Sequence, residues 1–131
     1  MLRRTFSSGS PWEPIVGYSR AVRVGVFVHV AGTTASDSSG GVIGEGDPYA
    51  QTKYALEKIA RSLQEAGAEM RHVVRTRMFV TDIARWEEVG RAHGEVFGSI
   101  RPAATMVEVR ALIDPRMMVE IEADAVIDEE A

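Results

Sequence analysis

The chain has no cysteine among its 131 residues, which excludes disulfides, thiolate nucleophiles and cysteine metal ligands. It also lacks an excess of basic charge. Its net charge is −4, whereas a nucleic-acid-binding domain normally carries a basic surface. No apolar run approaches the roughly 20 residues that span a bilayer. We therefore expect a cytoplasmic protein that has neither nucleic acid nor a membrane as a partner.

What is present is typical of a single folded domain. Apolar residues make up 45% of the chain and charged residues 26%, which favours a globular protein over a disordered one. The length supports one hydrophobic core, and no linker or internal repeat divides the sequence. We expect one domain over residues 1–131, with a solvated acidic end at residues 128–131.

Local patterns predict a hairpin followed by a helix. Residues 21–32 contain two β-branched runs that are broken at Gly25, which predicts two short strands. Asp47 and Pro48 are typical of the start of a helix. An apolar stripe at three-and-four spacing follows them as far as Gly67, where the helix is expected to stop.

The second half of the chain predicts a strand, a helix and two further strands. Residues 72–82 form the strand, and the helix is expected to be capped by Asp82 and to end at Gly98. Its buried face is predicted to comprise Trp86, Val89, Ala92, Val96 and Phe97. Strands at 104–113 and 118–127 complete the order β-β-α-β-α-β-β, which predicts an α+β fold with two helices on one face of a sheet.

Alternation along the last three strands divides their side chains between two faces of the sheet. One set is expected to face the helices: Val74, Thr76, Met78 and Val80; Thr105, Val107, Val109 and Ala111; Val119, Ile121, Ala123 and Ala125. The other set is Arg75, Arg77 and Phe79; Met106, Glu108, Arg110 and Leu112; Glu120, Glu122 and Asp124. This second face is either solvated, with ion pairs between strands, or buried by self-association. Its apolar members favour self-association.

Four sequence blocks resemble those of the reactive intermediate deaminase family, also called Rid or YjgF-like. They are "VGYSRAVRVG", "RMFVTDIARWEEV", "RPAATMVEV" and "MVEIEADAV", and the resemblance runs from about Tyr18 to Val126. It implies a chorismate-mutase-like fold with a mixed sheet, assembled as a homotrimer around a central barrel. Three ligand clefts would then lie between subunits.

The resemblance also implies an activity, the hydrolysis of imines and enamines such as 2-aminoacrylate to 2-oxo acids and ammonia. This reaction needs a cation for the substrate carboxylate and a carboxylate that orients water and handles its proton. It also needs a partly dry pocket with an aromatic wall, and it requires no metal or organic cofactor.

The family's site residues can be carried over one at a time. Glu120 matches the glutamate that positions water and is the predicted catalytic residue. Tyr18 matches the pocket tyrosine. The carboxylate-binding arginine is replaced by Ala104, and the cysteine two residues later is replaced by Met106. The predicted substrate contacts are Tyr18, Gly32, Thr33, Arg77, Ala104, Thr105 and Met106.

The absence of a cation at Ala104 weakens the case for the archetypal substrate. One charge-assisted contact contributes roughly 1.5–3 kcal/mol, so we do not assign 2-aminoacrylate hydrolysis. Arg77 is the best substitute for the missing anion contact, because it lies on the polar face. Arg101, Arg75 and Arg110 are further candidates. Each of the four has the alternative role of an ion pair with a nearby acid.

Our leading hypothesis is a homotrimer that binds a small, anionic metabolite between subunits and hydrolyses an imine, enamine or related bond. An alternative is a trimer that binds ligands or proteins without catalysis. A pericyclic enzyme of the chorismate type is less favoured, because it needs several cations and only Arg77 and Arg101 look available. No metal site is expected, since the three histidines form no pair on one helix face.

Overall fold

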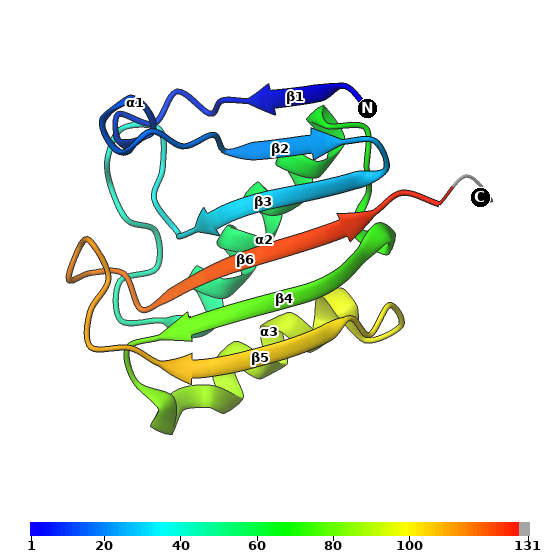
Figure 1. Ribbon diagram of the computed structural model, residues 1–131. Helices are drawn as coiled ribbons and strands as arrows, with labels where there is room; N and C mark the ends of the chain where they lie inside the picture. Colours follow the sequence, from blue (N-terminus) through cyan, green and yellow to red (C-terminus); the bar gives the residue numbers. More distant parts are fainter. Residues whose placement is uncertain (129–131) are drawn as a thin grey trace.

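The computed structural model of the protein describes residues 1–128, so the predicted solvated end falls mostly outside the described residues. Its centre is a six-stranded mixed sheet in the order β1-β2-β3-β6-β4-β5, and α2 and α3 cover one face (Figure 1). Only β4 and β5 run parallel; the other neighbouring strands are antiparallel. The strands are β1 (Arg3–Phe6), β2 (Ala21–Val24), β3 (Phe27–Thr33), β4 (Val73–Val80), β5 (Ala103–Glu108) and β6 (Val119–Val126). The α+β fold is confirmed.

The N-terminal segment adds two elements that the sequence analysis did not predict. β1 pairs with β2 at the edge of the sheet, and α1 (Trp12–Val16) is a short helix that ends at Gly17. Gly17 adopts a left-handed backbone with φ of 88°, a conformation that favours glycine. This turn leads the chain through Tyr18 into the start of β2.

Helix α2 (Pro48–Glu65) forms as predicted. The Asp47 side chain accepts a hydrogen bond from the Ala50 backbone N–H at 3.0 Å, and Pro48 occupies the first turn. The predicted stripe is buried among β3 and β6, with Leu56, Ile59 and Leu63 at its centre. The helix therefore supplies most of one wall of the core.

Helix α3 (Trp86–Phe97) differs from the prediction at its start. Asp82 caps a short 3-10 turn, Ile83–Arg85, rather than α3 itself. Trp86 is the first residue of α3, and its ring lies beside Gly90 one turn later. It is 53% exposed, so the prediction that it lies in the core is wrong. Val89 and Phe97 are buried, as predicted.

A β-bulge corrects the predicted faces of β4. Val73 is 3% exposed whereas Val74 is 47% exposed, because the pairing with β6 shifts register between Val73 and Arg75. From Thr76 onward the predicted alternation holds. The prediction that Val74 faces the helices is therefore wrong.

The predicted faces of β5 are inverted. β5 ends at Glu108, and its parallel pairing places Thr105 beside Arg77, Met106 beside Met78, and Val107 beside Phe79. Paired residues share a face of the sheet, so Met106 packs against the core and Thr105 and Val107 lie opposite. Each of the two alternating sets of side chains along this strand mixes polar and apolar residues. The sequence pattern therefore did not indicate which set faces the helices.

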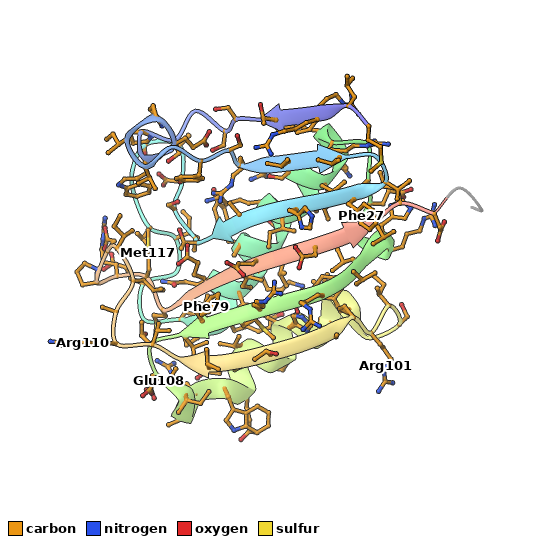
Figure 2. All side chains as sticks on the ribbon, in the orientation of Figure 1. Phe27, Phe79, Arg101, Glu108, Arg110 and Met117 are labelled. Atoms are coloured by element: carbon orange, nitrogen blue, oxygen red, sulfur yellow. The ribbon has the colours of Figure 1, made fainter. Side chains whose placement is uncertain are left out.

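The sheet face without helices is called the open face below (Figures 1 and 2). Its side chains include Phe27, His29, Arg75, Arg77, Phe79, Thr105, Val107, Glu120, Glu122 and Asp124. Phe27 is 46% exposed and Val107 is 43% exposed. Among residues 1–128, no helix has the length and apolar character needed to cross a membrane.

Candidate functional site

Glu120 lies on β6 at the open face, close to the backbone of β3. The pairing of β3 with β6 is irregular between Val30 and Thr33, and this irregularity brings Gly32 against the carboxylate. A Cβ atom at Gly32 would lie 2.5 Å from Oε2 of Glu120 and 2.9 Å from its Cδ. Only glycine leaves room for the carboxylate in this position.

Arg20 joins this group from the start of β2. It is 9% exposed, and its Nη2 donates a hydrogen bond to the Gly32 carbonyl oxygen at 2.5 Å. Its guanidinium carbon lies 5.7 Å from the centre of the Tyr18 ring. Tyr18, Arg20, Gly32 and Glu120 therefore form one cluster at the end of the open face.

The sequence analysis missed Arg20, although it stands two residues after Tyr18 in the same family-like block. Arginine is rarely buried, so nothing in the local pattern marked this one. The N-terminal segment positions its backbone: the Arg20 N–H donates a hydrogen bond to the Phe6 carbonyl oxygen at 2.8 Å, next to the paired residues Phe6 and Ala21.

Burial shifts the pKa values of both charged groups of the cluster, Glu120 and Arg20. It raises the pKa of Glu120 above its ordinary value; the nearby positive charge of Arg20 opposes this shift, and the negative charge of Glu122 reinforces it. Burial also lowers the pKa of Arg20, and Tyr18, Glu13 and Glu120 counteract that effect. A carboxyl group with a raised pKa exchanges protons more readily near neutral pH.

A cavity of about 400 Å³ lies beside the cluster on the open face. Its lining includes Tyr18, Ala31, Glu122 and Asp124, but neither Arg20 nor Glu120. Tyr18 is the member of the cluster that lines it. A ligand that contacts Glu120 would therefore have to extend from this cavity toward the end of the sheet.

Arg77, the predicted anion contact, is engaged by carboxylates. Its Nη1 lies 3.0 Å from Asp124 Oδ2 and 3.6 Å from Glu122 Oε1. His29 Nδ1 lies 2.8 Å from the other oxygen of Asp124. Burial alone would raise the pKa of Asp124, but the hydrogen bonds from His29 and Arg77 outweigh it and lower that pKa. This arrangement matches the alternative role given for Arg77, an ion pair with nearby acids of the same chain.

The other predicted contacts do not converge on Glu120 within one chain. Ala104 pairs with Thr76 and Met106 with Met78, so both lie on the face opposite to Glu120. Thr105 is on the open face beside Arg77. Thr33 is 1% exposed, and its hydroxyl donates to the Ala31 carbonyl oxygen at 2.8 Å.

Neither substitute arginine near β5 reaches the cluster. Arg101 is exposed in the turn before β5 and points away from the sheet, and Arg110 extends outward beyond the end of β5 (Figure 2). Among residues 1–128, no group of three or more histidine or acidic side chains is placed to hold a metal ion. That the protein needs no cofactor stays a prediction.

Comparison with known proteins decides the family. A model of the family described as Endoribonuclease L-PSP matches residues 9–127. The chain belongs to this family, which is also called the YjgF or Rid family. The predicted resemblance is thereby confirmed, while the existence of a subgroup without the arginine stays a prediction.

Individual relatives cover almost the whole chain. A crystal structure of a YjgF/YER057c/UK114 family member from Mycobacterium tuberculosis is 55% identical, with a TM-score of 0.88, over 96% of this chain and 100% of that one. An uncharacterised protein from Streptomyces coelicolor is 43% identical over 93% of this chain and 90% of its own length. A 3-aminoacrylate deaminase from Acinetobacter baylyi is 32% identical over 86% of this chain and 88% of its own length. The chain is thus similar to all three relatives in sequence, and to the Mycobacterium tuberculosis protein in fold as well.

Proposed function

We propose that this protein is a homotrimer that binds a small, anionic metabolite in clefts between subunits and hydrolyses an imine or enamine in it. The proposal rests on the half-buried Glu120, whose pKa is raised by burial and whose carboxylate lies against Gly32 and near Arg20. The relative named 3-aminoacrylate deaminase supports the same class of reaction.

Glu120 would act on water and on the leaving nitrogen. Its carboxylate accepts one proton as water adds to the imine carbon and passes it to the nitrogen, which gives a carbinolamine. It then accepts the hydroxyl proton and passes that to the nitrogen as the carbon–nitrogen bond breaks and ammonia leaves. Each imine consumes one water and yields one carbonyl compound and one ammonia. An enamine first takes a proton on carbon and becomes the imine. Tyr18 forms the aromatic wall beside the cavity.

Two features support a trimer. Ala104 and Met106 lie on the opposite face from Glu120, so a cleft that contains all three needs residues from a second chain. The open face also carries Phe27 and Val107, both more than two-fifths exposed, which a second copy would cover.

The family description names an endoribonuclease, but the charge of this chain weighs against RNA as a substrate. Its net charge is −4, and Glu120, Glu122 and Asp124 line β6 on the open face. Phosphate contacts favour a basic surface instead. We therefore propose no nucleic-acid partner, and the cytoplasmic location stays a prediction.

The test is ammonia release from imines that an amino-acid oxidase generates in situ, with wild-type protein and Glu120→Gln. The amide has nearly the same shape but cannot accept the proton, so we expect a loss of about a hundred-fold or more in the rate above the spontaneous reaction. For 2-aminoacrylate we expect weak activity even in the wild type, because Ala104 carries no charge. Equal rates for the two proteins would contradict the role of Glu120. The absence of any acceleration by the wild type would favour the non-catalytic alternative.

A further inference from the structure

Arg20 is the only arginine among residues 1–128 that is buried, and it is buried without a carboxylate partner. Arg77, Arg85 and Arg116 each lie within 3.0 Å of a carboxylate oxygen. Within the described part of the chain, no carboxylate lies within 4.0 Å of the Arg20 guanidinium. Yet Arg20 is more deeply buried than any of those three.

The hydrogen bonds of Arg20 are also incomplete. Its Nη2 donates to Gly32, but its Nε is buried without an acceptor among residues 1–128. One carbonyl contact does not offset the desolvation of a full positive charge. Glu13 is near enough to influence Arg20, but its carboxylate is bound by the Ser8 backbone N–H at 3.1 Å and the Ser8 hydroxyl at 2.6 Å.

A second cation adds to the positive potential at this end of the sheet. Lys58 on α2 donates to the Thr34 and Ser36 carbonyl oxygens at 2.8 and 2.9 Å. Burial, together with the nearby charges of Arg20 and Arg61, lowers the pKa of Lys58 to about 8. Two partly desolvated cations are thus close enough to interact, and an anion bound beside them would offset their mutual repulsion.

We propose that Arg20 is the anion-binding residue of this site and takes the carboxylate of a small, planar ligand. This inference rests on the proposed function for the location of the ligand. Arginine matches a carboxylate through its planar set of parallel N–H donors. Tyr18 lines the cavity and its ring centre lies 5.7 Å from the guanidinium carbon, so a flat ligand can lie against Tyr18 and extend its carboxylate beyond the cavity to Arg20. The end of the ligand away from its carboxylate then approaches Glu120 across Gly32.

An anchor at Arg20 also explains how a site can work without a cation at Ala104. Arg20 stands at the start of β2, whereas Ala104 belongs to the edge strand β5 on the far side of the sheet. A ligand held by Arg20 would reach Glu120 of the same chain, so its binding would not depend on a cation at Ala104.

The decisive experiment compares small carboxylates with their neutral amides. Pyruvate and benzoate, each paired with its amide, are titrated into the wild type, Arg20→Gln, Arg20→Lys and Arg77→Gln. The Nε–H resonance of Arg20 is followed by NMR, because burial protects this proton from exchange. Arg77→Gln is the matched control: it removes the same charge from an arginine whose partners are carboxylates of this chain.

We expect the wild type to prefer at least one carboxylate over its amide by about ten-fold or more, with a shift of the Arg20 Nε–H resonance. Arg20→Gln should weaken carboxylate binding by about ten- to a hundred-fold and remove the preference. Arg20→Lys should fall between the two, and Arg77→Gln should keep the preference. Circular dichroism checks that each variant is folded. The wild-type comparison and the resonance shift stand even if Arg20→Gln does not fold.

Three results would overturn the assignment: equal binding of both carboxylates and their amides to the wild type, a preference that survives in Arg20→Gln, or a preference lost in Arg77→Gln alone. These binding measurements need no turnover, so they separate this inference from the proposed reaction. Carboxylate preference without imine hydrolysis would refute the reaction only. Hydrolysis that depends on Glu120 without any carboxylate preference would refute the role of Arg20 only.

Discussion

At the scale of single residues, burial gives opposite properties to two carboxylates of the same strand. Glu120 and Asp124 both lie on β6 and both face the open side of the sheet. Burial dominates at Glu120, because its nearest cation is directed at the Gly32 carbonyl oxygen rather than at its carboxylate. At Asp124 the hydrogen bonds from His29 and Arg77 dominate. The two groups are therefore expected to respond to pH with opposite signs.

The raised pKa of Glu120 predicts a loss of stability as pH rises. Above the ordinary pKa of 4.5 and below the raised folded-state value, the folded protein binds more protons than the unfolded chain, so its stability falls through that window. Glutamine does not titrate. We expect Glu120→Gln to gain melting temperature relative to the wild type between about pH 4 and pH 7, as measured by thermal unfolding.

Asp124→Asn is the control of opposite sign. The folded-state pKa of Asp124 lies below its ordinary value of 3.8, so its stabilising contribution is present above that value and is lost as pH falls through the lowered one. The variant should therefore be more destabilised near neutral pH than near about pH 3. If raising the pH shifted the melting temperatures of both variants, relative to the wild type, in the same direction, the opposite pKa shifts of Glu120 and Asp124 would be contradicted.

At the scale of elements, the sequence predicted the buried face of a helix or strand correctly where its apolar and polar residues separate cleanly. The stripe of α2 and the alternation of β6 each separate apolar from polar residues, and both were confirmed. β5 has polar and apolar residues in both of its alternating sets, so its faces were assigned the wrong way round. The 3-10 turn before Trp86 and the burial of Arg20 depend on packing between distant segments, which a local pattern does not contain.

The bulge in β4 yields a test with two neighbouring valines. Val73→Ala should lower the free energy of unfolding by about 2 kcal/mol, because Val73 is 3% exposed in the core. Val74→Ala should change it by about 0.5 kcal/mol or less in the isolated chain, because Val74 is 47% exposed. Urea denaturation of both variants measures the difference. A larger effect at Val74 would mean that β4 keeps the unbroken alternation of its sequence.

At the scale of the whole molecule, the two sides of the sheet are unequal. α2 and α3 bury one side, while the other exposes aromatic and aliphatic side chains between charged ones (Figure 2). A purely solvated face would gain nothing from Phe27, Phe79 and Val107. The ion pairs of Arg77 are compatible with an open face that is solvated and with one that a second copy covers. The exposed apolar residues are therefore the observation that favours self-association.

We expect the protein to sediment as a trimer of its 14.3 kDa chain at micromolar concentration. Phe79→Asp should dissociate it, because the new carboxylate would be buried beside Glu120 without a partner. Trp86→Asp is the matched control, since Trp86 is also aromatic and 53% exposed but lies on α3, away from the open face. We expect the control to remain trimeric, and circular dichroism should show both variants folded. A wild-type mass near that of one chain would contradict the trimer. A trimer that survives Phe79→Asp would place the interface elsewhere than on the open face.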